Sequence, residues 1–292
     1  MFEKIKKWNR KRIESARKKR LVNYLNKAIS NAQDKLAEEL KDVRSCFESG
    51  KVYFIPNEWI EEYNKDTVTV EYDSMKNLYY VYWHGKKMYW KRGISVDEIR
   101  ENVNRLMIEQ DARSPHKYTV DEHNGNGIVA DIGAAEGCFA LTIIENVEHI
   151  YLFEYDNDWI EALQATFAPW KDKVTIVNKF VGNADNEKCV TLDKFFADKE
   201  LDSIKADIEG AEVDMVLGAK NCLENKIKSV NICVYHDYDD ERKITGFLLE
   251  HNFDIKVNPG LMWCYKHERP LERQFVHGVV YGIKHEYADE SL

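Results

Sequence analysis

Carboxylates and a histidine stand at the ends of apolar runs in the second half of the chain. Asp131, Glu154 and Asp207 each close such a run, and His236 and Asp237 follow another. If these runs are parallel strands, their carboxyl ends meet at one edge of the sheet. Open α/β sheets bind their ligands at that edge. The pattern therefore predicts a ligand site built from acidic side chains.

The turn after the first run favours a cationic ligand over a phosphate. It reads Asp131-Ile-Gly-Ala-Ala-Glu-Gly137, with two glycines four positions apart, and lacks the G-x-G-x-x-G pattern of dinucleotide folds. Glu136 would stand near the start of the next helix, where a pyrophosphate needs a site without competing negative charge. S-adenosyl-L-methionine carries a sulfonium and an α-ammonium group and no phosphate. We therefore expect Asp131, Gly133, Ala134, Glu136 and Gly137 to bind this cofactor, with the two glycines allowing a close approach of the backbone.

Three further carboxylates complete the expected cofactor site. Glu154 lies 21 positions after Gly133, where a carboxylate can accept hydrogen bonds from both ribose hydroxyls. Because this spacing is shared with NAD-binding folds, it does not discriminate between the two cofactors. Asp207 and Glu209 belong to the same edge of the predicted sheet and are expected to face the cofactor.

Four segments resemble the FkbM-type methyltransferases, which use S-adenosyl-L-methionine. They are the run from Val129 to Leu141, Phe153-Glu154, Thr191-Leu-Asp193, and Ile204-Lys-Ala-Asp-Ile-Glu-Gly-Ala-Glu212. The last is the most specific, although Ala206 stands where a bulkier apolar residue is common. The resemblance covers about residues 112–285. It implies a class I methyltransferase fold with a reversed seventh strand, and O-methylation, often of a sugar hydroxyl in glycan or secondary-metabolite synthesis.

Methyl transfer to a hydroxyl requires a group that removes the acceptor's proton. His236 is the best candidate base, because a neutral imidazole is available near pH 7, and Asp207 is expected to act beside it. His236 could equally cap a strand end and face only solvent. His116, in the Ser114-Pro-His-Lys-Tyr118 loop, could line the acceptor side or lie on the surface.

A divalent metal is an alternative to a protein base. The side chains that could hold it are Asp207, Glu209, His236 and Asp237, which offer oxygen ligands and an imidazole. We do not favour a metal, because clustered acids also bind an ammonium group. Glu209 and Glu212 could also simply stabilise the first turn of a helix.

Strands and helices alternate through the second half of the chain, which predicts an α/β fold with a doubly wound, mostly parallel sheet. The expected strands are 127–132, 149–154, 174–177, 202–207, 229–235, 253–257 and 278–283. The expected helices are 136–146, 156–167, 211–221 and 240–251.

The first half of the chain predicts a helical and antiparallel β extension. Residues 1–20 hold ten Lys and Arg against two Glu, a net charge of +8, and one or two helices are expected over about 3–47. Three aromatic-rich strands between 67 and 91 form a predicted meander, followed by a helix at about 95–110. The meander's aromatic side chains could stack on a sugar or simply pack the strands.

These elements suggest three units: a basic helical extension at 1–50, a meander with a linking helix at 51–111, and a methyltransferase domain at 112–292. The extension is expected to shape the acceptor pocket or to mediate association. Its basic helix could dock on an acidic surface, a neighbouring subunit or an anionic membrane.

Composition narrows the function classes. The 292-residue chain has a net charge of −9, which argues against a nucleic-acid binder, and it contains no apolar run long enough to span a membrane. Its six cysteines form no CxxC pair, which is typical of reduced thiols in a cytoplasmic protein. We therefore expect a cytoplasmic enzyme, able to lie at the inner face of a membrane, that acts on a small-molecule or glycan acceptor. A non-catalytic interaction module and an NAD(P)-dependent oxidoreductase are the alternatives.

Overall fold

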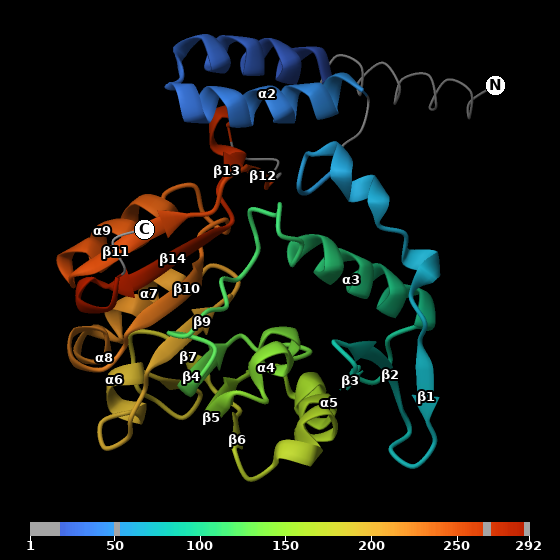
Figure 1. The fold of residues 1–292 in the computed structure, drawn as a ribbon, viewed down its shortest axis with the longest axis vertical. Helices are drawn as coiled ribbons and strands as arrows, with labels where there is room; N and C mark the ends of the chain where they lie inside the picture. Colours follow the sequence, from blue (N-terminus) through green and yellow to red (C-terminus); the bar gives the residue numbers. More distant parts are fainter. Residues whose placement is uncertain (1–17, 50–52, 265–269, 289–292) are drawn as a thin grey trace.

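A seven-stranded sheet forms the centre of the computed structural model, which describes residues 18–49, 53–264 and 270–288 (Figure 1). The strand order is β11-β14-β10-β9-β4-β5-β6, and β14 runs antiparallel to both of its neighbours while the other pairs are parallel. The strands are β4 (Gly127–Ile132), β5 (Val147–Phe153), β6 (Val174–Val177), β9 (Ser203–Ala206), β10 (Ser229–Cys233), β11 (Phe253–Val257) and β14 (Val279–Lys284). The predicted doubly wound, mostly parallel sheet with a reversed last strand is confirmed.

Helices cover both faces of this sheet, because successive strand residues point to opposite sides. On β4, Val129 packs into a core with helices α4 and α5, whereas Ala130 packs into a second core with helices α6 to α9. The helices are α4 (Cys138–Ile143), α5 (Asn157–Phe167), α6 (Leu192–Phe195), α7 (Glu212–Leu217), α8 (Lys220–Asn225) and α9 (Asp240–Glu250). The helix predicted at 136–146 is observed as the shorter α4. The helix predicted at 211–221 is interrupted at Gly218 and Ala219, which divide it into α7 and α8.

An antiparallel meander lies beside α4 and α5, on the same face of the sheet. Its strands are β1 (Glu71–Asp73), β2 (Leu78–Trp83) and β3 (Lys86–Tyr89), and helix α3 (Val96–Glu109) follows. The Tyr89 backbone N–H donates to Thr166 Oγ1 of α5 at 2.9 Å, which ties the meander to the main domain. Ser95 and Glu98 form a capping box that starts α3. The meander thus extends one of the two cores and does not stand alone.

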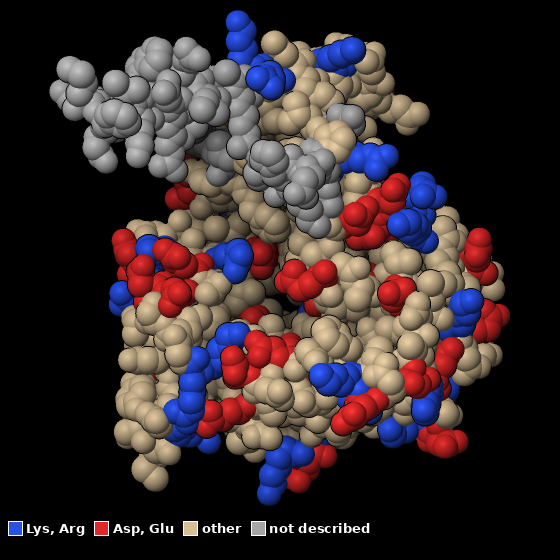
Figure 2. All heavy atoms as spheres, turned by 180° about the vertical axis from the view of Figure 1, so that it is seen from behind, with Lys and Arg blue, Asp and Glu red and all other residues tan. Residues whose placement is uncertain are grey.

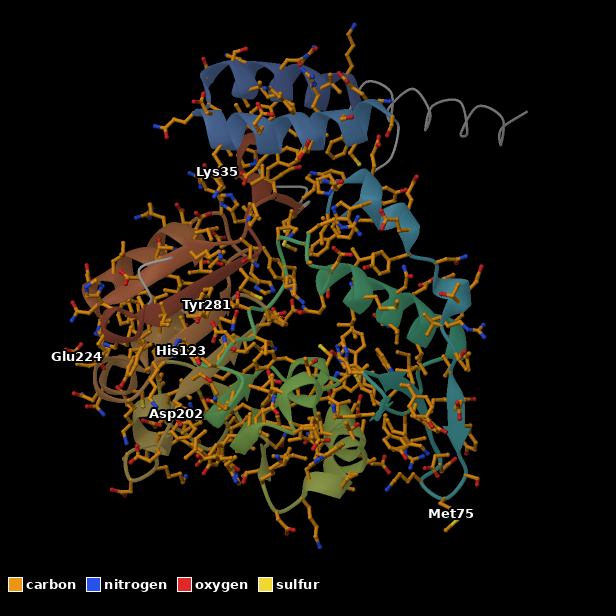
Figure 3. All side chains as sticks on the ribbon, viewed as in Figure 1. Lys35, Met75, His123, Asp202, Glu224 and Tyr281 are labelled. Atoms are coloured by element: carbon orange, nitrogen blue, oxygen red, sulfur yellow. The ribbon has the colours of Figure 1, made fainter. Side chains whose placement is uncertain are left out.

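The first meander strand is shorter than the sequence predicts. Thr67 belongs to a 3-10 turn, because the Asn64 side chain accepts the backbone N–H of Asp66, and the strand begins only at Glu71. The turn between β1 and β2 projects from the body, and Met75 at its tip points outward (Figure 3).

Two helices, over residues 18–31 and at α2 (Asp34–Glu48), form a hairpin above the sheet (Figure 1). Leu25 and Phe47 pack with Phe275 in a separate small core. Residues 1–17, with most of the predicted basic segment, lie outside the described residues. No described helix combines the length and apolar character needed to cross a membrane. No disulfide bond is formed within the described residues.

The remaining elements are short connections between those above. They are η1 (Glu58–Glu62), η2 (Lys65–Thr67), η3 (Ala168–Trp170), β7 (Phe180–Val181), β8 (Cys189–Val190), β12 (Met262–Trp263), η4 (Leu271–Arg273), β13 (Phe275–Val276) and η5 (His285–Tyr287).

Candidate active site

Two cavities open at the carboxyl ends of β4, β5 and β9 and share a wall. The smaller has a volume of about 380 Å³ and the larger about 520 Å³. Both are lined by Gly133, Ala135, Trp159, Asp207 and Glu209. The predicted edge of the sheet therefore holds two adjoining cavities. Seen from behind, the surface is hollowed near its middle, and acidic side chains lie around that hollow (Figure 2).

The turn that follows β4 carries two glycines in left-handed backbone conformations. Gly133 has φ +75°, and a Cβ there would lie 1.9 Å from the Asp207 carbonyl oxygen. Gly137 has φ +83° and caps α4, and its Cβ would lie 2.8 Å from the Phe167 ring. Packing within the chain, and not only the approach of a ligand, therefore requires both glycines.

Glu154 lies in the wall of the smaller cavity with its carboxylate fixed by backbone donors. The N–H of Ala135 donates to Oε2 at 2.8 Å, and the N–H of Asp156 donates to Oε1 at 2.7 Å. Tyr155 and Phe180 stack at 3.9 Å between ring centroids in the same wall. The smaller cavity thus combines a carboxylate held in place with an aromatic surface.

Asp131 lies beneath the turn in a buried ion pair and not in the wall of either cavity. The Lys205 ammonium is 3.0 Å from Asp131 Oδ1 and donates to the Gly133 carbonyl oxygen at 2.8 Å. Burial opposes the charge on Lys205, but Asp131 and Asp207 raise its pKa above the ordinary value. Asp131 therefore fixes the turn through Lys205. Ala134 and Glu136 line the larger cavity with Gly133.

The Asp207 carboxylate is the centre of the site. Tyr118 donates its hydroxyl proton to Oδ2 at 3.0 Å, and Tyr235 donates to Oδ1 at 3.2 Å. His116 Nε2 and His236 Nε2 each lie 3.6 Å from one of the two oxygens. Burial alone would raise the pKa of Asp207, but the neighbouring imidazoles and Lys205 hold it well below the usual range. Asp207 is therefore a carboxylate and not an acid.

His236 joins Asp207 to two glutamates. Its Nδ1 is 3.0 Å from Glu212 Oε1, and its Nε2 is 3.6 Å from Glu209 Oε2. The Glu212 side chain is fully buried, whereas that of Glu209 is 94% exposed. Although burial lowers the pKa of His236, Glu212 and the other carboxylates raise it above the ordinary value. Because α7 begins at Glu212, the interpretation that Glu209 also stands in its first turn is wrong.

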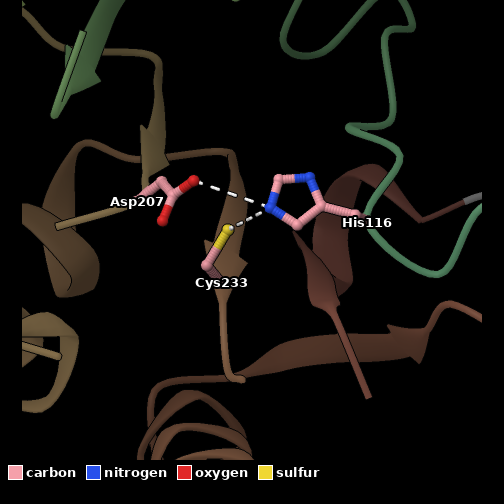
Figure 4. Close-up of side chains that lie close together, drawn as sticks. All are labelled: His116, Asp207 and Cys233. Atoms are coloured by element: carbon pink, nitrogen blue, oxygen red, sulfur yellow. Dashed lines mark hydrogen bonds and ion pairs between the residues drawn. The ribbon is translucent and has the colours of Figure 1, made fainter. Parts of the chain in front are cut away.

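His116 reaches the site from the loop after α3. It is 2% exposed, so the alternative of a surface residue is wrong. Its Nε2 faces both Asp207 Oδ2 and Cys233 Sγ, the latter at 3.8 Å (Figure 4). Its Nδ1 is buried, and no described residue gives it a hydrogen-bond partner. Burial lowers the pKa of His116, but Glu109 and Asp207 raise it above the ordinary value.

Two groups of side chains within the described residues are close enough to share a cation. They are His116, Asp207 and Cys233, and Asp207, Glu212 and His236. Asp237 belongs to neither group among the described residues, and its carboxylate accepts the N–H of Asp239. Both Asp207 oxygens already accept hydrogen bonds from tyrosine hydroxyl groups. The Asp207 carboxylate therefore has hydrogen-bond partners without a bound cation.

Several residues of the site could not be identified from sequence. Glu109 lies at the end of α3 in the wall of the larger cavity, where burial raises the pKa of its carboxyl. Tyr118 and Tyr235 flank His116 and His236 in the chain, and this adjacency was the only local signal for them. Trp90 also lines the larger cavity, and its buried indole N–H has no hydrogen-bond partner in the part of the chain that the structure describes.

The family profile described as "Methyltransferase FkbM domain" matches residues 100–255, which is more than half of the chain. The chain belongs to the FkbM methyltransferase family. Its cofactor is accordingly S-adenosyl-L-methionine. No curated protein is similar enough to match this sequence.

Solved structures with a similar arrangement are distant in sequence. The FkbM methyltransferase from Methylobacillus flagellatus KT is 15% identical with a TM-score of 0.46, and the match covers 91% of this chain and 59% of that one. The chain therefore spans less than two thirds of the length of the Methylobacillus protein. The Aeropyrum pernix fibrillarin with natively bound S-adenosyl-L-methionine is 13% identical with a TM-score of 0.38, covering 74% of this chain and 99% of that one.

Proposed function

We propose that this FkbM methyltransferase transfers a methyl group from S-adenosyl-L-methionine to a hydroxyl group of a carbohydrate or glycan precursor. The observation that carries the proposal is the pair of cavities that meet at Asp207. The smaller cavity is suited to the cofactor. The larger cavity has an aromatic wall and contains the imidazole of His116 beside the same carboxylate.

The residues around the smaller cavity and the adjoining turn at Gly133 fit the cofactor by their chemistry. The ligand has two ribose hydroxyls and two cationic groups. The carboxylates of Glu154, Asp207 and Glu209 line the smaller cavity, and Glu136 lines the larger one together with Gly133. Glu154 would accept the ribose hydroxyls, while the others would face the cationic methionyl part. Ala134 and Gly137 shape the turn, and Asp131 holds it through Lys205. Glu136 stands directly before the cap of α4, which disfavours the pyrophosphate of NAD at this helix end.

The larger cavity is proposed to hold the acceptor. Trp90, Trp159 and Phe54 give it an aromatic wall, and Lys91 and Arg105 add polar groups. Binding sites of this mixture suit a ring with an apolar face and several hydroxyls. Four of these five residues precede residue 112, so the extension at 51–111 would shape the acceptor pocket of the domain at 112–292.

The bound cofactor supplies an activated methyl group on its sulfonium. The protein has to orient the acceptor hydroxyl, keep water out and remove the hydroxyl proton. Asp207 stays charged and sits between two imidazoles, so either His116 or His236 can receive that proton while Asp207 stabilises the resulting cation. One of these histidines is the proposed catalytic base, and Asp207 acts through it.

A mass-shift screen tests this function. The protein is incubated with deuterium-labelled S-adenosyl-L-methionine and a panel of methyl glycosides, nucleotide sugars and oligosaccharides. We expect one labelled methyl group on a sugar hydroxyl, and loss of that product with Asp207→Asn. Binding of S-adenosyl-L-methionine without methylation of any sugar would contradict a carbohydrate acceptor and favour an interaction module. Preferential binding of NAD would contradict the cofactor assignment and favour an oxidoreductase.

A further inference from the structure

The two histidines beside Asp207 differ in what their second ring nitrogen contacts. His236 directs Nε2 at Asp207 and Nδ1 at the buried carboxylate of Glu212. His116 directs Nε2 at Asp207, and its Nδ1 is buried with no hydrogen-bond partner among the described residues. A buried imidazole nitrogen without a partner is costly unless a ligand supplies one.

The two side chains also differ in their access to the acceptor. His116 lines the larger cavity together with Glu109, Tyr118 and Tyr235, whereas His236 is part of the wall of neither cavity. His236 faces the other oxygen of Asp207, and it lies against Glu209 of the loop before α7 and Glu212 at the start of that helix.

We propose that His116, and not His236, is the general base for the acceptor hydroxyl, with Nδ1 as the accepting nitrogen and Asp207 as its positioning residue. This proposal rests on the proposed function. The carboxylate holds the proton on Nε2 and so leaves the Nδ1 lone pair for the acceptor, which is the arrangement by which a carboxylate sets the tautomer of a catalytic histidine. The Nε2 to Oδ2 distance of 3.6 Å is long for a hydrogen bond, as in many active sites without a bound ligand.

The proposed step balances in atoms and charge. The acceptor O–H bond breaks and its proton joins His116 Nδ1, as the oxygen forms its bond to the methyl carbon. The bond from that carbon to sulfur breaks, and its electron pair stays on sulfur. The imidazolium that forms lies beside the Asp207 carboxylate, which stabilises it electrostatically.

The charges around His116 set the pH at which it can act. Glu109 of α3 and Asp207 after β9 raise its pKa, and Lys205 of β9 lowers it. The neutral groups packed around it are Tyr118 on its own loop and Cys233 and Tyr235 at the end of β10. The base form exists above the pKa of His116, so the rate of methyl transfer should rise with pH. The positive charge of the bound cofactor would shift that rise toward lower pH.

Nitrogen NMR of histidine side chains tests the proposal without an acceptor. The full-length protein, labelled with ¹⁵N-histidine and saturated with S-adenosylhomocysteine, is titrated from about pH 6 to about pH 9. The His116 signals are assigned by their absence in His116→Gln. We expect a neutral ring with the proton on Nε2 and a bare Nδ1. A proton on Nδ1 of the neutral ring, or a ring that stays cationic over the whole range, would overturn the proposal.

Kinetics with any sugar found by the mass-shift screen gives the second test. His116→Gln should lower kcat by roughly 10²–10⁴-fold and abolish the pH-dependent rise. His236→Gln should keep that rise, with a smaller loss of kcat, and the surface variant His285→Gln should behave as the wild type. Calorimetry with S-adenosylhomocysteine shows that each variant is folded. If His236→Gln removes the pH-dependent rise while His116→Gln keeps it, the base is His236. A screen that yields no methylated sugar counts against the carbohydrate acceptor, and the NMR result then decides the role of His116 alone.

Discussion

The Lys205 ammonium and the Asp131 carboxylate form an ion pair of 3.0 Å in which both side chains are at least 95% buried. Lys205 also donates to the Gly133 carbonyl oxygen, so this pair holds the turn that separates the two cavities. Removing one partner of such a pair leaves an uncompensated buried charge, which costs about 3–5 kcal/mol.

We therefore expect Lys205→Met to lower the free energy of unfolding by about 3–5 kcal/mol, as measured by urea denaturation. The double variant Lys205→Met with Asp131→Leu should recover part of this loss, because it removes both charges. A single variant with the stability of the wild type would show that Asp131 is neutral in the folded protein.

Glu154 is expected to determine cofactor affinity. Its carboxylate is held in the smaller cavity by two backbone donors, in an orientation set before the ligand arrives. Glu154→Ala should weaken the binding of S-adenosylhomocysteine by about 1.5–3 kcal/mol, since hydrogen bonds to a charged acceptor are lost. Calorimetry measures this change. Glu148→Gln, an exposed position on β5, the strand that ends directly before Glu154, is the matched control, and equal affinities for both variants would remove Glu154 from the cofactor site.

The conformation at Gly133 predicts a severe effect of a single methyl group. The backbone has φ +75°, and an added Cβ would lie 1.9 Å from the Asp207 carbonyl oxygen, so Gly133→Ala must move the backbone that carries Asp207. We expect a loss of more than about 2 kcal/mol in stability, together with weaker cofactor binding. Gly246→Ala in α9 meets no atom within 4 Å and should raise stability by up to about 1 kcal/mol. If Gly133→Ala left both stability and cofactor binding unchanged, the turn would be able to change its backbone conformation without cost.

The contact of α2 with the main domain is predicted to depend on pH. His277 Nδ1 lies 2.8 Å from Glu241 of α9, and its Nε2 lies 3.2 Å from Glu39 of α2. Burial lowers the pKa of His277, but these two carboxylates raise it to about 9. Because the folded pKa exceeds the unfolded value of about 6.5, the stabilisation is complete below about pH 6.5 and is lost as the pH rises through about 9.

The comparison of the wild type with His277→Gln isolates this contribution. At about pH 6 the wild type should be more stable by about 2 kcal/mol, a value reduced for the partial exposure of Glu241, and at about pH 9.5 the difference should be small. Unfolding free energies at both pH values measure it. A difference that does not change with pH would show that His277 acts through packing alone.

The sequence predicted elements best where a short apolar run is bounded by turn residues. β4 and β6 are such runs and have the predicted bounds, and so does β11, in which apolar and polar residues alternate. The helix expected at 211–221 is interrupted because Gly218 packs against the Gly182 backbone, a contact between distant segments. Periodicity along the chain carries no information about such a contact.

The same distinction holds for the site. Asp207 and His236 follow strands that share an edge, so topology alone brings them together. Glu109 and His116 approach that edge from α3 and the loop after it, and Tyr118 donates to Asp207 across 89 positions. The place of Glu109 depends on how the extension packs on the domain, and the places of His116 and Tyr118 depend on the course of the loop after α3. Neither spacing nor composition encodes these arrangements.

Both oxygens of Asp207 accept hydrogen bonds from tyrosine hydroxyl groups, and we therefore expect that methyl transfer does not depend on a metal ion. The hydroxyl groups of Tyr118 and Tyr235 donate hydrogen bonds to this carboxylate, so it does not need a bound cation as a partner. We expect methyl transfer to survive EDTA and to be unaffected by added Mg²⁺, in an assay of the sugar found by the mass-shift screen. The double variant Tyr118→Phe with Tyr235→Phe should lower kcat by at least about 10-fold, because each lost donor costs a buried carboxylate about 1–3 kcal/mol and loosens its hold on His116. Tyr82→Phe, an exposed tyrosine of the meander, is the control. Loss of activity in EDTA with recovery in Mg²⁺ would instead make Asp207 a metal ligand.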